Sequence, residues 1–330
     1  MQNCNEKKLN DMLMFEIQRY TAEDKKLWDR YVSKARNATF LFYRDYMDYH
    51  KERFTDYSLM FYKKGHLHSV MPAHKDGDVF YTHMGLTYGG LLMDVNVTTS
   101  DVMCLFEDLN AFLRKEGFKK VIYRAIPWVF HRLPSEEDLY SIYWKCQARL
   151  KTRMAGTVIF MDEHLRWRKD HRRRLRLSQQ SGIRVVRDGS LSEFWPILCD
   201  NLHNKFDARP VHTLQEIELL KSRFPKEIVQ YNAYKDNQIV GGLTFYVMGH
   251  VLHGQYSGTN DVGKNTGAME AIYDQVMYHD FPNIRYLDFG TSNEKGGEFL
   301  NEGLINHKEG YGGRAVCYDT YEWEVPDKEI

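Results

Sequence analysis

The order of predicted elements repeats in the two halves of this 330-residue chain, and such a repeat limits the fold more than any single motif. In the first half, an apolar-rich segment at residues 53–63 is followed by a polar turn and a strand from Leu67. In the second half, residues 223–235 are followed by a polar turn and a strand from Ile239. Two apolar strands around a tight polar turn predict a β-hairpin in each half.

The elements after each hairpin also correspond. Each half continues with a third strand, a helix and a last strand, at residues 79–83, 100–115 and 121–125 in the first half and 251–256, 266–279 and 286–289 in the second. Helical periodicity precedes both hairpins. The pattern predicts an α/β protein of two domains, 1–150 and 151–330, each with a mixed, mostly antiparallel sheet flanked by helices. The acidic stretch after Ser135 predicts a linking helix at the end of the first domain.

Bulk composition excludes some classes of protein. The chain has 45 lysine and arginine residues and 45 aspartate and glutamate residues, so its net charge gives no indication of nucleic-acid binding. The five cysteines are scattered without a CxxC or Cys/His cluster, which argues against a metal site and for free thiols in a reducing cytoplasm. No apolar run reaches 18 residues and the N-terminus is polar, so we expect a cytoplasmic protein without a membrane span or signal peptide.

The richest local signal lies at residues 284–313, which predict a strand ending at Asp288, a glycine-rich turn, a short helix and a cationic loop around Lys308. Glycines at this density let backbone amides approach a ligand closely. The Asp-Phe-Gly triplet at 288–290 also occurs in protein kinases, but a kinase needs a glycine-rich strand pair, a strand lysine and an HRD loop upstream. None of these is present, so we reject the kinase interpretation.

Several short sequence motifs resemble those of a known family. These are PVHTL at 210–214, GQY at 254–256, DFGTS at 288–292, KEGYG at 308–312 and, in the first half, LTYGGL at 86–91 and RAIP at 124–127. In this order the chain resembles the FemABX peptidyltransferases of the GNAT acyltransferase superfamily, from about Phe15 to Val325. The resemblance implies two tandem GNAT folds and transfer of an acyl or aminoacyl group to an amine in cell-envelope synthesis. It implies aminoacyl-tRNA or acyl-CoA as donor and a small-molecule or nucleotide-sugar acceptor.

In a GNAT fold the acyl donor lies in a gap between the fourth and fifth strands, and the next helix offers its N-terminus to phosphate. Here the corresponding segment contains Gly263, Lys264, Asn265, Thr266 and Gly267. Two glycines and a lysine before a helix suit a pyrophosphate cradle. The spacing departs from the superfamily's glycine signature, so a simple helix-capping loop is the alternative.

Three residues are candidates for catalysis. The resemblance implies that Lys308 stabilises developing negative charge or binds an acceptor phosphate; the alternative is a solvated turn lysine. Tyr256 ends the third strand of the second half, where its phenol would serve as a general acid or simply pack its ring. Asp288, at a strand's carboxyl end, is either a base for the acceptor amine or an anchor for the loop. We expect all three to line one pocket.

A run of cations at residues 166–176 forms a helical stripe that includes Arg172. This stripe could bind a pyrophosphate or a tRNA backbone, or be a solvated face. Arg209, beside Pro210, is a second phosphate-binding candidate. The competing function is a non-catalytic GNAT-like binding protein whose donor site is degenerate.

Overall fold

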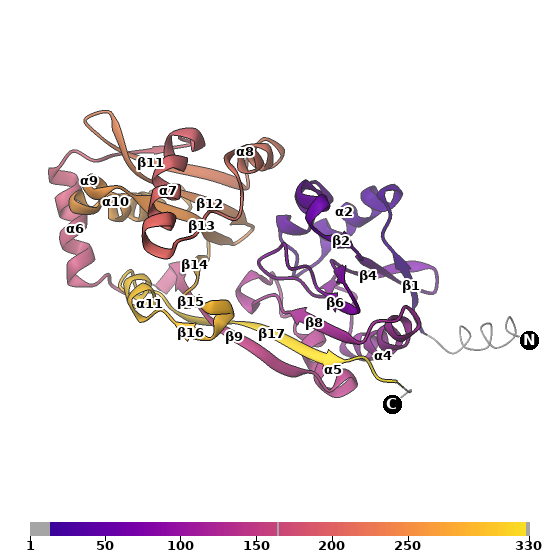
Figure 1. Cartoon of the computed structure of the whole chain (residues 1–330). Coiled ribbons are helices and arrows are strands. Elements are labelled where there is room, and N and C mark those ends of the chain that lie inside the picture. Colours follow the sequence, from indigo (N-terminus) through magenta and orange to yellow (C-terminus); the bar gives the residue numbers. More distant parts are fainter. Residues whose placement is uncertain (1–13, 164, 328–330) are drawn as a thin grey trace, which may run out of the picture. The chain divides into compact units, whose positions relative to one another are not determined.

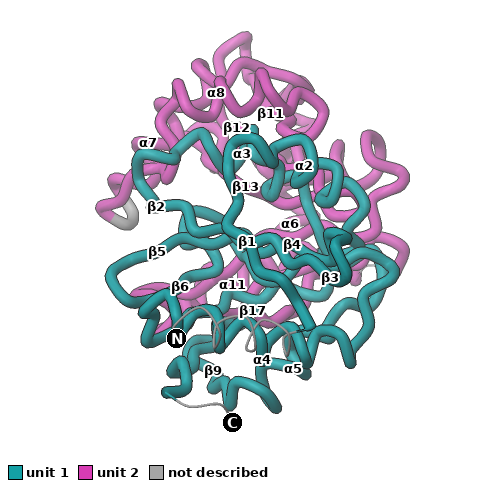
Figure 2. The backbone as a smooth tube through the Cα atoms, turned by 90° about the vertical axis from the view of Figure 1, so that its right-hand side faces the viewer, with its two compact units in different colours: residues 1–153, 318–330 teal, residues 154–317 magenta. Residues whose placement is uncertain are grey.

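The computed structural model describes residues 14–163 and 165–327, apart from the side chains of 205 and 206 (Figure 1). The chain divides into two compact units, residues 1–153 with 318–330 and residues 154–317 (Figure 2). Strands β9 (Arg149–Phe160) and β17 (Arg314–Glu324) each run from one unit into the other. The sequence predicts a single division after residue 150, with the whole C-terminal segment in the second domain. In the structure the last strand returns to the first unit.

Unit 1 contains two small sheets. The first is antiparallel with the order β1-β3-β4-β7, made of β1 (Glu16–Arg19), β3 (Leu59–Lys63), β4 (His66–Met71) and β7 (Leu92–Met93). In the second, β17 is followed by β8 (Lys120–Arg124), β6 (Val79–Tyr81), β5 (His74–Asp76) and β2 (Thr55–Asp56). Strands β6 and β8 are parallel and are joined through helix α4 (Thr99–Lys115). The other α-helices of unit 1 are α2 (Lys25–Lys34), α3 (Arg44–Met47) and α5 (Glu137–Cys146).

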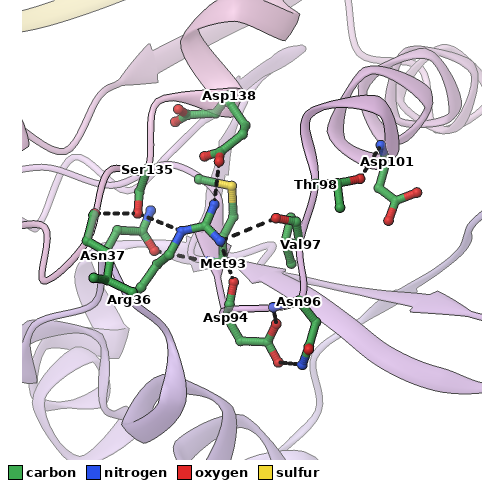
Figure 3. Close-up of polar contacts among 12 residues, drawn as sticks. Arg36, Asn37, Met93, Asp94, Asn96, Val97, Thr98, Asp101, Ser135 and Asp138 are labelled. Atoms are coloured by element: carbon green, nitrogen blue, oxygen red, sulfur yellow. Dashed lines mark hydrogen bonds and ion pairs between the residues drawn. The ribbon is translucent and has the colours of Figure 1, made fainter.

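A buried arginine ties three loops of unit 1 together (Figure 3). The Arg36 guanidinium donates to Ser135 Oγ at 2.8 Å and to the Asp94 and Val97 carbonyls at 2.7 and 3.2 Å. It also pairs with Glu137 Oε1 at 2.6 Å, at the start of α5. Because an arginine presents five donors in a rigid fork, one side chain can satisfy several loop carbonyls at once.

The main sheet of unit 2 has the strand order β10-β11-β12-β13-β14-β9, and β15 (Asn293–Glu294) and β16 (Phe299–Leu300) form a separate two-stranded sheet. The strands of the main sheet, besides β9, are β10 (Arg184–Arg187), β11 (Ile228–Lys235), β12 (Gln238–Met248), β13 (Val251–Thr259) and β14 (Tyr286–Thr291). All neighbours are antiparallel except β13 and β14. The helices are α6 (Lys169–Gln180), α7 (Leu191–Phe206), α8 (Leu214–Arg223), α9 (Asp261–Thr266), α10 (Ala268–Gln275) and α11 (Glu302–Glu309).

The predicted repeat is confirmed. Both units contain an antiparallel hairpin, a further strand, and a helix that leads into a strand parallel to that further strand. A parallel neighbour needs such a crossover, usually a helix. In unit 2 the helix α10 packs on a core that includes Tyr231, Phe245, Ile272 and Tyr311. In the described ranges, no helix combines the length and apolar character that crossing a bilayer requires.

Candidate functional site

Strands β13 and β14 diverge and leave a fork in the sheet of unit 2. They pair through Val251–Tyr286, Leu252–Leu287 and His253–Asp288, and there the pairing ends. Beyond this point β13 follows β12 as far as Thr259, whereas β14 pairs with β9 at Thr291. The divergence leaves Gly254 and Phe289 on either side of an opening, and both line a cavity. This is the gap between the fourth and fifth strands at which the resemblance implies a donor site.

The cavity has a volume of about 460 Å³. Its walls come from β13, β14 and helices α6, α7, α9, α10 and α11, all within unit 2. The lining includes the following polar and charged side chains: Asp170, His171, Arg174, Asn201, Ser257, Thr259, Lys264, Glu270, His307 and Lys308. This size is ordinary for a small-molecule site, or for one end of a larger ligand.

Lys308 lines the cavity, but it is not the loop residue that the sequence suggested. Residues Glu302–Glu309 form α11, because the Asn301 side chain caps the helix by accepting from Leu304 N at 2.8 Å. Lys308 therefore sits in the last helical turn, 8% exposed, and donates to the carbonyls of Gly290 at 3.0 Å and Thr291 at 2.7 Å. Burial lowers the pKa of Lys308 to about 8, against the opposing charge of Asp288. An ammonium has three donors, so one is left for a ligand.

Tyr256 does not line the cavity, which corrects the expectation of one shared pocket. Thr244 pairs with Tyr256 but Phe245 pairs with Gly254, so Gln255 is an extra residue in β13. Such a bulge reverses the alternation of side chains, and Ser257 rather than Tyr256 follows Gly254 on the cavity wall. The Tyr256 hydroxyl instead meets His212 Nδ1 at 2.5 Å, and burial raises the pKa of Tyr256 to about 12.

Asp288 is also absent from the cavity lining. It is completely buried, and one carboxylate oxygen lies 2.6 Å from His253 Nδ1 while the other accepts from Gly290 N at 2.9 Å. Because side chains alternate along a strand, Phe289 reaches the cavity and Asp288 points to the other face of the sheet. Of its two predicted roles, this geometry favours the anchor.

The predicted phosphate loop is largely helical. Residues Asp261–Thr266 form α9, whose cap Asn260 accepts from Gly263 N at 2.9 Å, and Gly267 is the left-handed residue between α9 and α10. Gly263 and Lys264 line the cavity, whereas Asn265, Thr266 and Gly267 do not. A Cβ at Gly263 would lie 2.1 Å from the Val240 carbonyl oxygen, and one at Gly267 would lie 2.2 Å from that of Arg174. Both glycines are thus required by close backbone packing.

Neither predicted arginine lines the cavity. Arg172 is half-buried on α6, and Arg209 is exposed in the loop between α7 and α8. The arginine that lines the cavity is Arg174, whose Nη1 donates to the Lys264 carbonyl at 3.1 Å. Helical spacing alone does not tell which member of an arginine run faces the protein, and α10 packs against the Arg174 face.

Sequence reasoning missed a cluster of titratable groups on the cavity wall. His171 Nδ1 lies 3.0 Å from Glu270 Oε1, and the Tyr311 hydroxyl donates to the same oxygen at 3.3 Å. The His307 ring lies 5.0 Å from the His171 ring, centroid to centroid. Burial alone would raise the pKa of Glu270, but the His171 hydrogen bond holds it below its usual value. Burial and His171 lower the pKa of His307. His171 and Glu270 lie far apart in the sequence, and the packing of α6 against α10 brings them together. The sequence alone carries no signal for this contact.

In the parts of the chain that the structure describes, no group of three histidine, cysteine or acidic residues is arranged to hold a metal ion. The cavity presents an ammonium at Lys308, cations at Arg174 and Lys264, and the cluster of His171, Glu270, His307 and Tyr311.

Comparison with known proteins shows the fold. No protein-family model matches the sequence, and a sequence comparison with curated proteins gives no match either. A solved structure of FemX is similar with a TM-score of 0.68 and 10% identity, over 94% of this chain and 97% of that chain. The C-terminal domain of a putative lysylphosphatidylglycerol synthetase from Agrobacterium fabrum gives 0.60 and 12%, over 91% and 92%.

A tandem GNAT protein from the clavulanic acid biosynthesis pathway gives a TM-score of 0.54 at 10% identity, over 95% of this chain and 99% of that chain. The chain therefore has the FemABX-like tandem GNAT fold that its sequence predicted. At these identities the likeness establishes architecture, and function is argued from the site itself.

Proposed function

We propose that this protein transfers an acyl or aminoacyl group from an activated donor to an amine acceptor, as part of cell-envelope synthesis. The observation that carries the proposal is the fork between β13 and β14, which opens into a cavity lined by Lys308. The amine nitrogen attacks the donor carbonyl, a C–N bond forms, and the C–O bond of an ester or the C–S bond of a thioester breaks. The spare Lys308 N–H stabilises the oxyanion while charge develops.

The surface of α6 favours aminoacyl-tRNA over acyl-CoA as the donor. Lys169, Arg173 and Arg176 are exposed, and no acidic partner lies within ion-pair distance of them among the described residues. The same helix contributes Asp170, His171 and Arg174 to the cavity. Unpaired cations next to a cavity suit a polyanion whose reactive end enters that cavity. The self-capped α9 also weighs against a CoA pyrophosphate, because Asn260 already accepts from Gly263 N.

The same α9 geometry favours one alternative, a ligand-binding protein that does not catalyse transfer. Both glycines of the segment are taken up by backbone packing rather than left open for a phosphate. In that case ligands would bind in the cavity without turnover.

A two-stage experiment tests the proposal. Thermal shift is measured with acetyl-CoA, a long-chain acyl-CoA, charged total tRNA, uncharged tRNA and a UDP-linked peptidoglycan precursor. A ligand at 100 times its Kd stabilises the protein by about 2.7 kcal/mol. Transfer of radiolabel from charged tRNA or from acyl-CoA to the precursor is then followed.

We expect a shift with charged tRNA and label in the precursor. A thermal shift without any transfer would support the binding protein instead. A protein that responds to none of these ligands would contradict both functions.

A further inference from the structure

The cavity contains one titratable group that is open to a ligand and that the roles assigned so far leave unused. His307, on α11, lines the cavity; part of its side chain is open to solvent, while neighbouring atoms crowd the rest of the ring. Among the described residues, neither of its ring nitrogens has a hydrogen-bond partner. Its ring is held in place by edge contacts with Tyr311 at 5.3 Å and by His171 at 5.0 Å between centroids.

The neighbouring groups are less suited to accept a proton. His171 Nδ1 is bonded to Glu270, and its Nε2 is buried without a hydrogen-bond partner against Gly310, where a Cβ would lie only 2.5 Å away, so it is closed to a ligand. The ammonium of Lys308 is bound to two carbonyl oxygens. His307 is therefore the histidine of this wall whose ring nitrogens are open to a proton released in the cavity; the carboxylate of Asp170, which also lines the cavity, lies 3.6 Å from Arg168.

We propose that His307 is the base that takes the proton from the acceptor amine, an inference that rests on the proposed transfer function. The amine nitrogen forms its bond to the donor carbonyl carbon and becomes positively charged. One proton passes from that nitrogen to a free ring nitrogen of His307. The tetrahedral intermediate then collapses, the donor's C–O or C–S bond breaks, and the leaving oxygen or sulfur takes up a proton from the imidazolium, which restores neutral His307.

The electrostatics of the wall keep this base in its neutral form. His171 and Arg174 on α6, and Arg168 just before it, act on His307 from one side, and Glu270 acts on it from α10. Desolvation and the charge of His171 lower the pKa of His307, while Glu270 opposes them. The imidazole is thus unprotonated at neutral pH and able to accept. A weak base suffices here, because an amine nitrogen that has attacked a carbonyl is far more acidic than the free amine.

The test compares His307→Gln and His307→Asn with wild type in the charged-tRNA and acyl-CoA transfer assays described above. His66→Gln, at an exposed histidine of unit 1, is the matched control. We expect kcat to fall about 100-fold in both His307 variants with KM and melting temperature unchanged. We also expect the decline of wild-type kcat on the acid side to disappear, because the group that titrates there is gone.

Two different results would contradict the proposal: one refutes the role of His307 alone, and the other refutes the proposed function. If wild type transfers label and both His307 variants retain kcat within threefold and keep the acid limb, His307 is not the base. If wild type itself transfers nothing from either donor, the proposed function fails, and the assignment of His307 falls with it.

Discussion

His253 and Asp288 are the last residues paired between β13 and β14, and their side chains meet at 2.6 Å where the two strands separate. The same carboxylate accepts from Gly290 N, and Gly290 in turn supplies one of the carbonyls that hold Lys308. A buried pair on one face of the sheet thereby fixes the backbone that positions a cation on the other. The His253–Asp288 pair at the fork thus helps to position Lys308 in the cavity through the backbone of Gly290.

Asp288→Asn should destabilise unit 2 markedly. The substitution removes a buried charge that accepts from His253 and from the Gly290 amide, and hydrogen bonds to charged groups contribute about 1.5–3 kcal/mol each. We expect the free energy of unfolding, measured with urea, to fall by about 2–3 kcal/mol. Asp236→Asn, at an exposed turn, is the control and should leave it unchanged. Wild-type stability in Asp288→Asn would show that the pair does not anchor the fork.

Lys308→Met should abolish transfer with little effect on folding. Losing one donor to a developing oxyanion costs on the order of 100- to 1000-fold in rate. Stability is subject to two opposing effects, since the variant loses two hydrogen bonds but also removes a desolvated ammonium. We expect the unfolding free energy to change by no more than about 1–2 kcal/mol. Lys226→Met, an exposed lysine, is the control. Full activity in Lys308→Met would leave Lys308 a structural residue only.

The lowered pKa of Lys308 predicts a pH effect of defined sign. Because Lys308 titrates near 8 in the folded protein and near 10.5 when unfolded, the unfolded state binds more protons between these values. Stability contributed by this group therefore rises with pH from about 8 to 10.5. The rate of transfer, which needs the Lys308 ammonium, should fall as the pH rises above about 8. Melting curves at pH 7.5 and 9.5 should show this rise in wild type and less of it in Lys308→Met; equal rises would refute it.

Unit 1 should lose stability in mild acid. The buried rings of His74 and His83 lie 5.6 Å apart between centroids, and burial lowers the pKa of His74 to about 4 despite nearby Asp76 and Asp56. Burial and the neighbouring histidines His50 and His74 hold the pKa of His83 well below its usual value.

The folded state consequently binds fewer protons than the unfolded state below pH 6.5, so stability falls as pH falls toward 4. His74→Gln should reduce the difference in melting temperature between pH 7.5 and pH 5. The exposed-histidine variant His66→Gln should not. An unchanged difference in His74→Gln would contradict the assignment.

Gly267→Ala tests whether the segment between α9 and α10 is a packing element. Gly267 has a φ of +76°, and a Cβ there would lie 2.2 Å from the Arg174 carbonyl oxygen. We expect a loss of at least about 1–3 kcal/mol of unfolding free energy from overpacking and backbone strain. Gly65→Ala is a matched control, since Gly65 also has positive φ but open space around it. Similar losses in both variants would mean that backbone conformation alone is responsible.

The sequence predicted what local periodicity and turn chemistry determine. The hairpins, the crossover helices and the strand ending near Asp288 were all recoverable, because each depends on residues close in the chain. The sequence did not reveal which side chains of β13 face the cavity. The bulge at Gln255 sets this, and it is defined only by the pairing of β13 with β12. The short helix before Lys308 was predicted, but its end was placed too early, because the glycines from Gly310 onward favoured a loop that already included Lys308.

The cluster on the cavity wall illustrates what a single sequence cannot give. His171, Glu270 and His307 come from three helices, and their distances depend on how α6 and α11 pack around α10. Each residue alone has an ordinary sequence context, and His171 is hidden inside a run of arginines. Tertiary packing supplies the information that spacing lacks.

The return of β17 to unit 1 sets the order in which a growing chain can finish its parts. Thr320 to Glu324 pair with β8, and the buried Trp323 donates to Asn110 Oδ1 at 3.0 Å. On the ribosome, the whole of unit 2 emerges before this strand does, so the unit that begins first is completed last. Until then the edge of β8 stays unpaired and the Trp323 site in the core stays empty. A chain truncated just before residue 318 would contain all of unit 2 but an unfinished unit 1.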